Sequence, residues 1–254
     1  ARQEHYDVIT AQDPFWRGLL AWKIARLTGA RLNLQLHADL KGQSLAKHVL
    51  GHIMLRHADS IRVVSERIKK EVEAVGVRAP VTVLPVFIDP APFMKVRRMP
   101  HPQKTILWIG RFEQEKTPLE AIAILKDVRA HGVDAKLIML GTGSLTIELK
   151  NAAQNLPVEF PGWQAPFPYL AVADVLLSTS LYESYGASIV EALAAGVPVV
   201  SRDVGVAREA GAHIAEDGDL ARAGGEGRAN GEQGQLKLPL LSAEAAMQRA
   251  DPSR

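Results

Sequence analysis

Two glutamates, Glu183 and Glu191, stand eight positions apart between two short apolar runs, residues 175–177 and 197–200. Each run is typical of a buried strand. Glu191 lies in an Ala/Leu/Ile/Val pattern with helical spacing, and Gly196 can end that helix. A strand, helix and strand in this order predict a parallel α/β sheet. Glu183 then falls at the carboxyl end of a strand, where such sheets bind ligands.

The start of the predicted helix favours an anionic ligand. Tyr185, Gly186 and Ala187 enter the helix at positions whose backbone N–H groups have no partner within the helix. Helix starts of this kind attract phosphate, and Gly186 lets a ligand come close to the backbone.

The same alternation of strands and helices extends over the chain of 254 residues, 47% of them hydrophobic, which predicts an α/β fold in one or two domains. We expect strands at 6–10, 31–36, 60–65, 81–84, 105–109, 135–140, 157–159, 174–179 and 197–201. We expect helices at 15–27, 44–57, 66–75, 117–131, 144–154, 167–172 and 184–195. Ser65 is the expected cap of the helix that begins at Glu66.

Composition along the chain predicts its division into domains. Residues 85–104 are Pro-rich and basic and have little periodicity, so we expect a linker there. We expect a first domain at residues 1–101, which includes most of this linker, and a second domain at residues 102–222. Residues 223–234 are rich in Gly and polar side chains, so we expect 223–254 to be a flexible segment with a terminal helix within 236–247.

Residue usage excludes several classes of protein. The chain has no cysteine, which excludes disulfides and thiolate metal sites. Its histidines are scattered, so we expect no metal site. No apolar run is long enough to span a membrane, and the first residues do not form a signal peptide, which favours a cytoplasmic protein.

Charge differs between the two halves of the chain. Residues 1–104 hold 17 Lys/Arg and 9 Asp/Glu, and the remainder hold 13 and 19. This asymmetry favours two domains with different partners, although ordinary surface variation is an alternative. The basic half allows peripheral contact with an anionic membrane, at the inner membrane face. It lacks interleaved aromatic residues, so we do not expect nucleic-acid binding.

Five motifs resemble those of glycosyltransferase family 4, whose members are retaining enzymes with two Rossmann-like domains of the GT-B type. Residues 183–191 resemble the family's E-x7-E region, and residues 108–116 its G-R-x4-K segment. Residues 137–143 resemble the next strand and glycine loop, 160–163 the nucleotide-base loop, and 173–177 the strand before the glutamates. Together they cover roughly residues 104–211 in the family's order. The resemblance also implies that the first domain is incomplete at its amino terminus, since the family has further βα units before Tyr6.

The resemblance implies a role for several residues at the donor. Arg111 and Lys116 match basic residues that neutralise a leaving diphosphate, Glu191 matches the ligand of the ribose hydroxyls, and Glu183 lies near the donor sugar. The alternatives are a solvated loop with surface ion pairs, and ordinary charges on a helix. The full expected donor set is Gly110, Arg111, Lys116, Gly141, Trp163, Glu183, Tyr185, Gly186, Ala187 and Glu191.

His37 and Asp13 are the expected residues on the acceptor side. His37 matches a histidine close to donor sugar and acceptor, which makes it a catalytic candidate with Glu183, Arg111 and Lys116. The alternatives are a hydrogen-bonded structural histidine, a turn-forming aspartate at Asp13, and a core-packing role for Trp163.

These features predict a retaining transfer of a hexose from a UDP- or GDP-linked sugar to a hydroxyl acceptor, in polysaccharide, glycolipid or glycoconjugate synthesis. No cofactor or metal is expected. Two alternatives stay open: a non-catalytic fragment that binds a nucleotide sugar, and a nucleotide-sugar epimerase of the same architecture.

Overall fold

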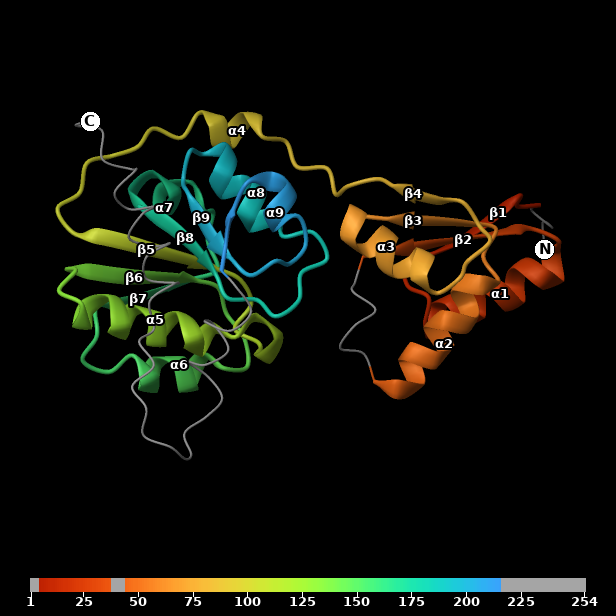
Figure 1. Ribbon diagram of the computed structural model, residues 1–254, viewed down its shortest axis with the longest axis horizontal. Helices are drawn as coiled ribbons and strands as arrows, with labels where there is room; N and C mark the ends of the chain where they lie inside the picture. Colours follow the sequence, from red (N-terminus) through yellow and green to blue (C-terminus); the bar gives the residue numbers. More distant parts are fainter. Residues whose placement is uncertain (1–4, 38–43, 216–254) are drawn as a thin grey trace. The chain divides into compact units, whose positions relative to one another are not determined.

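The computed structural model describes residues 5–37 and 44–215 (Figure 1). These residues form two compact α/β units. The first comprises the described residues through Phe87 together with Glu183–Tyr185, and the second comprises Ile88–Tyr182 and the described residues from Gly186 onward. The predicted flexible segment and terminal helix at 223–254 lie outside the described residues.

The first unit is a parallel sheet of four strands in the order β1-β2-β3-β4. Its elements are β1 (Val8–Ala11), α1 (Trp16–Thr28), β2 (Arg31–Leu36), α2 (Leu45–Arg56), β3 (Ser60–Val63), α3 (Glu66–Ala74) and β4 (Val81–Val83). Period-two alternation in β2 buries Leu32, Leu34 and Leu36 in one core cluster. The expected cap of α3 is confirmed, because the Ser65 hydroxyl accepts a hydrogen bond from the Ile68 amide.

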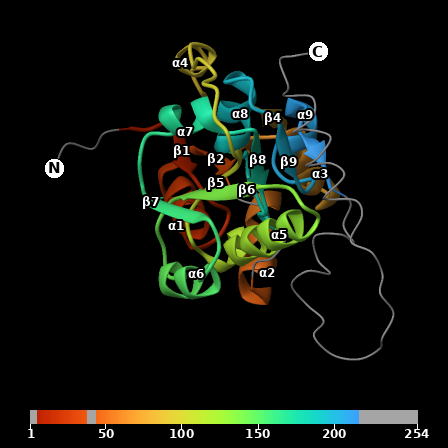
Figure 2. The same cartoon turned by 90° about the vertical axis from the view of Figure 1, so that its left-hand side faces the viewer.

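The second unit is a parallel sheet of six strands in the order β10-β9-β8-β5-β6-β7. Its elements are α4 (Ala91–Met94), β5 (Lys104–Ile109), the 3₁₀ turn η1 (Gln114–Lys116), α5 (Pro118–Ala130), β6 (Ala135–Leu140), α6 (Thr146–Ala152), β7 (Val158–Gly162), α7 (Phe167–Val172), β8 (Val175–Ser178), α8 (Ala187–Ala194), β9 (Val199–Ser201), α9 (Ala207–Ala210) and β10 (His213–Ile214). Figures 1 and 2 show α5 and α6 on one face of the sheet and α7 and α8 on the other.

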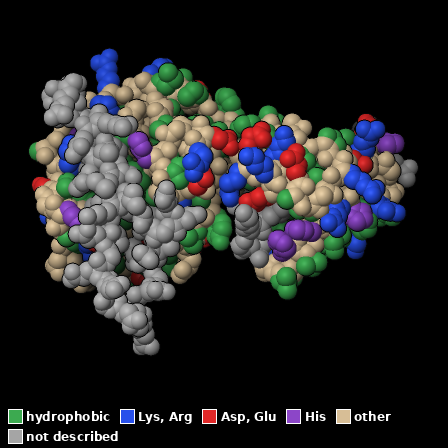
Figure 3. Space-filling model, in the orientation of Figure 1, with side chains coloured by type: hydrophobic (Ala, Val, Ile, Leu, Met, Phe, Trp, Pro, Cys, Tyr) green, Lys and Arg blue, Asp and Glu red, His purple; other side chains and the backbone are tan. Residues whose placement is uncertain are grey.

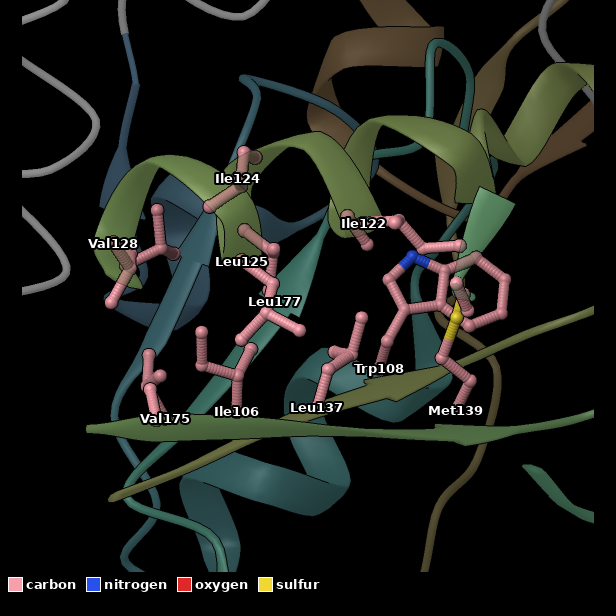
Figure 4. Packing of buried hydrophobic residues seen from close by; sticks show 14 of the residues in the cluster. Ile106, Trp108, Ile122, Ile124, Leu125, Val128, Leu137, Met139, Val175 and Leu177 are labelled. Atoms are coloured by element: carbon pink, nitrogen blue, oxygen red, sulfur yellow. The ribbon is translucent and has the colours of Figure 1, made fainter. Parts of the chain in front are cut away.

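Both faces of this sheet are buried, so its strands are apolar at consecutive positions. Ile106 and Trp108 of β5 pack toward α5 with Leu137 and Met139 of β6 (Figure 4). Leu107, between them, packs in the separate cluster on the opposite face. The α/β prediction is confirmed, and the continuous apolar runs follow from this three-layer arrangement.

The linker expected at 85–104 differs from the structure. Residues 91–94 form α4, whose Phe93 is 9% exposed in the core cluster shared with α7 and α8. The Met99 amide donates to the Ala171 carbonyl at 2.8 Å. The second unit therefore begins at Ile88 rather than at residue 102, because an apolar side chain within the Pro-rich segment anchors that segment to the core. Within the described ranges, no helix has both the length and the apolar character to cross a bilayer.

Candidate functional site

The candidate site lies at the carboxyl ends of β5 and β8, which are neighbours in the second sheet. From β5 the chain continues to β6 on one side, and it returns to β8 on the other side. Such a reversal of strand order opens a crevice above the carboxyl ends of the two strands. The G-R-x4-K segment follows β5, and the E-x7-E segment follows β8.

The loop after β5 presents Arg111 to solvent. The Arg111 side chain is 65% exposed, and its Nη2 lies 2.7 Å from Glu115 Oε1. This is the surface ion pair that the solvated-loop alternative expects, and it also leaves the guanidinium accessible to an anion. Lys116 is half-buried in η1, five residues further along the loop.

The loop after β6 packs directly on the loop after β5. The Phe112 amide donates to the Thr142 carbonyl at 3.0 Å. A Cβ on Gly141 would lie 1.8 Å from the Gly110 carbonyl oxygen, and one on Gly143 would lie 2.5 Å from the Phe112 carbonyl oxygen. The two glycines therefore permit contact between the backbones of two loops, which shapes the wall of the candidate site.

The loop after β8 leads into α8, where Gly186 adopts a left-handed conformation with φ 91°. Ala187 is the first residue of the helix, three positions later than the helix start expected from the sequence. Glu191 lies one turn into α8 and is half-buried. Burial raises the pKa of its carboxyl group above the ordinary value, because the charged form loses solvation. A diol that donates two hydrogen bonds would offset this loss.

Hydrogen bonds join the two motif-bearing loops. The Leu181 amide donates to the Glu115 carbonyl at 2.9 Å, and the Thr179 hydroxyl donates to the Lys116 carbonyl at 2.8 Å. Segments that are more than 60 residues apart are thus brought together at one edge of the sheet. The arrangement combines an exposed guanidinium, a lysine, a helix start and a carboxylate, which suits a phosphate-bearing ligand.

Trp163 follows β7 at the same edge of the sheet, and it is 71% exposed. The alternative interpretation, in which Trp163 packs in the core, is therefore wrong. The carbonyl of its neighbour Gly162 accepts a hydrogen bond from the Gly141 amide at 3.0 Å. An exposed indole beside the glycine loop is free to stack on a planar group.

His37 directly follows β2 in the first unit. Its Nε2 is buried, and no described residue makes a hydrogen bond to it. Burial, and secondly the charge of Arg62, lower the pKa of the imidazole, which favours its neutral form. A buried ring nitrogen of this kind is suited to a hydrogen bond with a ligand hydroxyl.

Asp13 has local partners in the first unit. One carboxylate oxygen accepts from the Phe15 amide at 2.9 Å, and the other lies 3.5 Å from Arg17 Nη1. These contacts support the turn-forming alternative. Glu183 and Tyr185 belong to the first unit by their contacts, although their segment follows β8 of the second unit. Glu183 also interacts with another residue.

The sequence interpretation missed a group of buried polar residues beneath the candidate site. Thr179 directly follows β8, Arg202 directly follows β9, and Glu120 lies in the first turn of α5; all three are under 9% exposed. The position of Thr179 and Arg202 immediately after apolar strands was an available signal, because polar residues at carboxyl ends of strands face the ligand edge. In the described part of the chain, no three metal-ligating side chains cluster.

Two parallel-sheet α/β units, with a candidate anion site at the strand ends of the second, define a protein of the GT-B class. The sequence family described as "Glycosyltransferase Family 4" matches residues 1–92, and the one described as "Glycosyl transferases group 1" matches residues 103–225. The two matches lie on successive parts of the chain and both families consist of glycosyltransferases, so the chain belongs to the glycosyltransferases.

Named glycosyltransferases are similar in sequence to this chain. The chain is 27% identical over 232 residues to alpha-monoglucosyldiacylglycerol synthase of Streptococcus pneumoniae, with 79% of this chain and 53% of the relative covered. It is 34% identical over 150 residues to a GDP-mannose-dependent alpha-(1-6)-phosphatidylinositol dimannoside mannosyltransferase of Mycobacterium tuberculosis, with 53% and 38% covered. The chain thus spans about half or less of the length of these relatives.

Solved structures share the fold. Anabaena Alr3699/HepE in complex with UDP has a TM-score of 0.69 at 20% identity, with 97% of this chain and 75% of that chain covered. TarM has a TM-score of 0.68 at 16% identity, with 96% and 50% covered. These likenesses establish the GT-B architecture.

Proposed function

We propose that the second unit binds the nucleoside diphosphate of a sugar nucleotide at the ends of β5 and β8. The observation that carries the proposal is the joining of the two motif-bearing loops through Thr179–Lys116 and Leu181–Glu115. This joining holds Arg111 and Lys116 at the edge where α8 begins. The diphosphate then meets two cations and the start of a helix, and Glu191 accepts hydrogen bonds from the ribose hydroxyls.

In the whole protein, this site supports transfer of a hexose from a UDP- or GDP-linked donor to a hydroxyl acceptor. Negative charge grows on the diphosphate as the glycosidic bond breaks, so fixed cations there lower the barrier. The leaving diphosphate takes the acceptor proton as the acceptor attacks from the same face. This course retains the anomeric configuration and needs no protein nucleophile. Glu183 is assigned to the hydroxyls of the donor sugar, and His37 is assigned to the acceptor side.

The proposal is tested by titrating the chain with UDP, GDP and ADP in a calorimeter. Arg111→Ala and Lys116→Ala should each lower the affinity for the preferred nucleotide roughly ten- to a hundredfold, since a charge-assisted hydrogen bond contributes about 1.5–3 kcal/mol. Lys126→Ala, which removes an exposed cation of α5, is the matched control and should leave the affinity unchanged. Equal affinities for the parent and both site variants would refute the assignment.

Turnover separates transfer from the two alternative functions. With a protein of the full length of the relatives, product should form only when donor and acceptor are both present, and its anomeric configuration should match that of the donor. A binding fragment would give no turnover, and an epimerase would convert the donor without an acceptor.

We further propose that the acceptor is linked to a lipid and that the first unit meets an anionic membrane surface. Helices α1 and α2 contain no Asp or Glu. On α2, Leu45, Val49 and Ile53 are exposed at every fourth position, and Trp16, Leu20, Ile24 and Leu27 are exposed on α1. Lys, Arg and His side chains gather over this unit, at the right of Figure 3. Exposed apolar positions among cations are typical of helices that lie on anionic lipid.

A groove of about 610 Å³ between β1 and α1 adds to this surface, since Ile9, Leu20 and Ile24 line it and Arg17 stands beside them. The names of both relatives above contain a glycolipid, which supports a lipid-linked acceptor.

Sedimentation with vesicles tests the membrane proposal. The chain should pellet with vesicles that contain phosphatidylglycerol and stay in the supernatant with neutral phosphatidylcholine. Val49→Ser with Ile53→Ser should reduce pelleting, whereas Ile147→Ser, which changes an exposed apolar residue of α6, should not. Equal partition into neutral and anionic vesicles, or none into either, would argue against this surface.

A further inference from the structure

A buried ion pair lies beneath the loop that carries Lys116. Arg202 Nη2 lies 2.9 Å from both carboxylate oxygens of Glu120. The two side chains are 8% and 6% exposed, and they are 82 positions apart in the sequence. Arg202 follows β9 and Glu120 lies in the first turn of α5. A buried pair of this kind adds little net stability compared with apolar side chains, so its presence suggests another role.

Thr179 connects this pair to the candidate site. Its carbonyl accepts hydrogen bonds from Arg202 Nη1 and from the Thr117 hydroxyl. Its hydroxyl accepts from Trp108 Nε1 at 2.9 Å and donates to the Lys116 carbonyl at 2.8 Å. The ends of β5, β8 and β9 are thereby tied together through side chains as well as through the sheet.

Thr117 is the point at which the network acts on the loop. Its φ is 40°, in the left-handed region that a β-branched residue rarely adopts. The Thr117 hydroxyl also lies 3.3 Å from Glu120 Oε2. A strained turn persists only where its surroundings hold it. The residue immediately before the turn is Lys116, so whatever holds Thr117 also sets the direction of Lys116.

We propose that Arg202 and Glu120 are positioning residues for diphosphate binding, which act by holding Thr117 and Thr179 and through them Lys116. This inference rests on the proposed nucleotide site and adds two residues that none of the sequence motifs includes. Neither residue touches the ligand in this proposal; they decide where the Lys116 cation stands.

The test compares a nucleoside diphosphate with its monophosphate. The chain is titrated with UDP and UMP, with GDP and GMP, and with ADP and AMP. For the nucleoside that binds best, the affinity for the diphosphate divided by the affinity for the monophosphate reports the contacts of the second phosphate. Arg202→Met combined with Glu120→Leu replaces the ion pair with apolar side chains and should preserve the fold. We expect this double variant to lose about tenfold in the ratio, while its monophosphate affinity and melting temperature stay near the parent values.

Glu120→Gln and its combination with Thr117→Gly form the second arm. Glu120→Gln weakens the hold on Thr117, so the ratio should fall. Glycine adopts the left-handed turn without strain, so Thr117→Gly in the Glu120→Gln background should restore part of the ratio. If the ratio stays at the parent value in both the double apolar variant and Glu120→Gln, the positioning role is overturned, and the proposed nucleotide site is not affected. A parent chain that binds none of the nucleotides would overturn the proposed function and this inference with it.

Discussion

At the scale of single residues, Glu191 combines a cost in stability with its proposed use in binding. Its carboxyl is half-buried in α8, and burial raises its pKa in the folded state above the ordinary 4.5. As the pH rises from 4.5 through that raised value, the unfolded chain releases its proton first, so folding stability falls. Above the raised pKa the loss is complete and constant. At any pH above the raised pKa, the protein without ligand therefore carries a half-buried charge whose lost solvation lowers folding stability.

Glu191→Gln should raise the melting temperature of the apo chain at pH 7, and the gain should shrink toward zero as the pH falls well below 4.5, where the parent carboxyl becomes protonated in both states. Differential scanning calorimetry at several pH values measures this difference. Glu148→Gln, at an exposed position of α6, is the control and should show no such trend.

The same variant should bind its preferred nucleoside diphosphate more weakly. It should also lose the preference of the parent for the ribonucleotide over the 2′-deoxynucleotide, because one oxygen acceptor has become an amide donor. If the Glu191→Gln variant keeps this preference, Glu191 does not bind the ribose hydroxyls.

At the scale of elements, the site is built from loops whose backbones touch, and glycine is the residue that permits this. Gly141 and Gly132 both have positive φ, at 152° and 87°. An added Cβ would meet the Gly110 carbonyl at 1.8 Å from Gly141, and nothing within 4 Å from Gly132. Substitution of these two glycines therefore separates the destabilisation caused by a steric contact from that caused by the backbone conformation.

Gly132→Ala should cost about 1–2 kcal/mol of unfolding free energy, which is the backbone penalty alone. Gly141→Ala should cost a further 1–3 kcal/mol or so, because the loop after β6 must move away from the loop after β5. Urea denaturation measures both values. Gly141→Ala should also weaken nucleotide binding, whereas Gly132→Ala should not. Equal unfolding free energies in the two variants would show that the loops separate freely.

At the scale of the whole molecule, the second unit has core clusters of its own. Both of its clusters consist of residues between 88 and 215, and Phe93 belongs to the one beneath α7 and α8. Arg98 adds a hydrogen bond to the Leu170 carbonyl at 3.1 Å. His101 adds one to Asp174 at 2.7 Å. The segment from Ile88 to the start of β5 is thus part of the folded unit.

A fragment of residues 88–254 should fold and bind nucleotide as the full chain does. A fragment of residues 102–254 should be less stable by about 3–5 kcal/mol, the usual cost of losing a buried phenylalanine. Thermal denaturation of the two fragments checks the difference, and calorimetry with UDP, GDP and ADP checks binding. Identical melting temperatures would return the boundary to residue 102.

The amino-acid sequence by itself determined the order and type of the longer elements, whereas the short elements α4, α9 and β10 were not predicted. Strand 105–109, strand 135–140 and the cap at Ser65 follow from apolar runs and from one hydroxyl beside one helix, and these signals act over a few neighbouring residues. The motifs likewise placed Arg111, Lys116 and Glu191 on the loops and helix where the structure has them, because each follows its own strand. Their roles toward a ligand remain predictions.

Only the tertiary structure decided which of these residues meet. The Arg202–Glu120 pair spans 82 positions, and its existence depends on β8 lying between β5 and β9 in the sheet. The need for glycine at position 141 depends on a second loop that approaches it, and the burial of Phe93 depends on α7 and α8. Local patterns cannot encode such contacts, because each is a property of two distant segments whose separation is set by sheet order and packing.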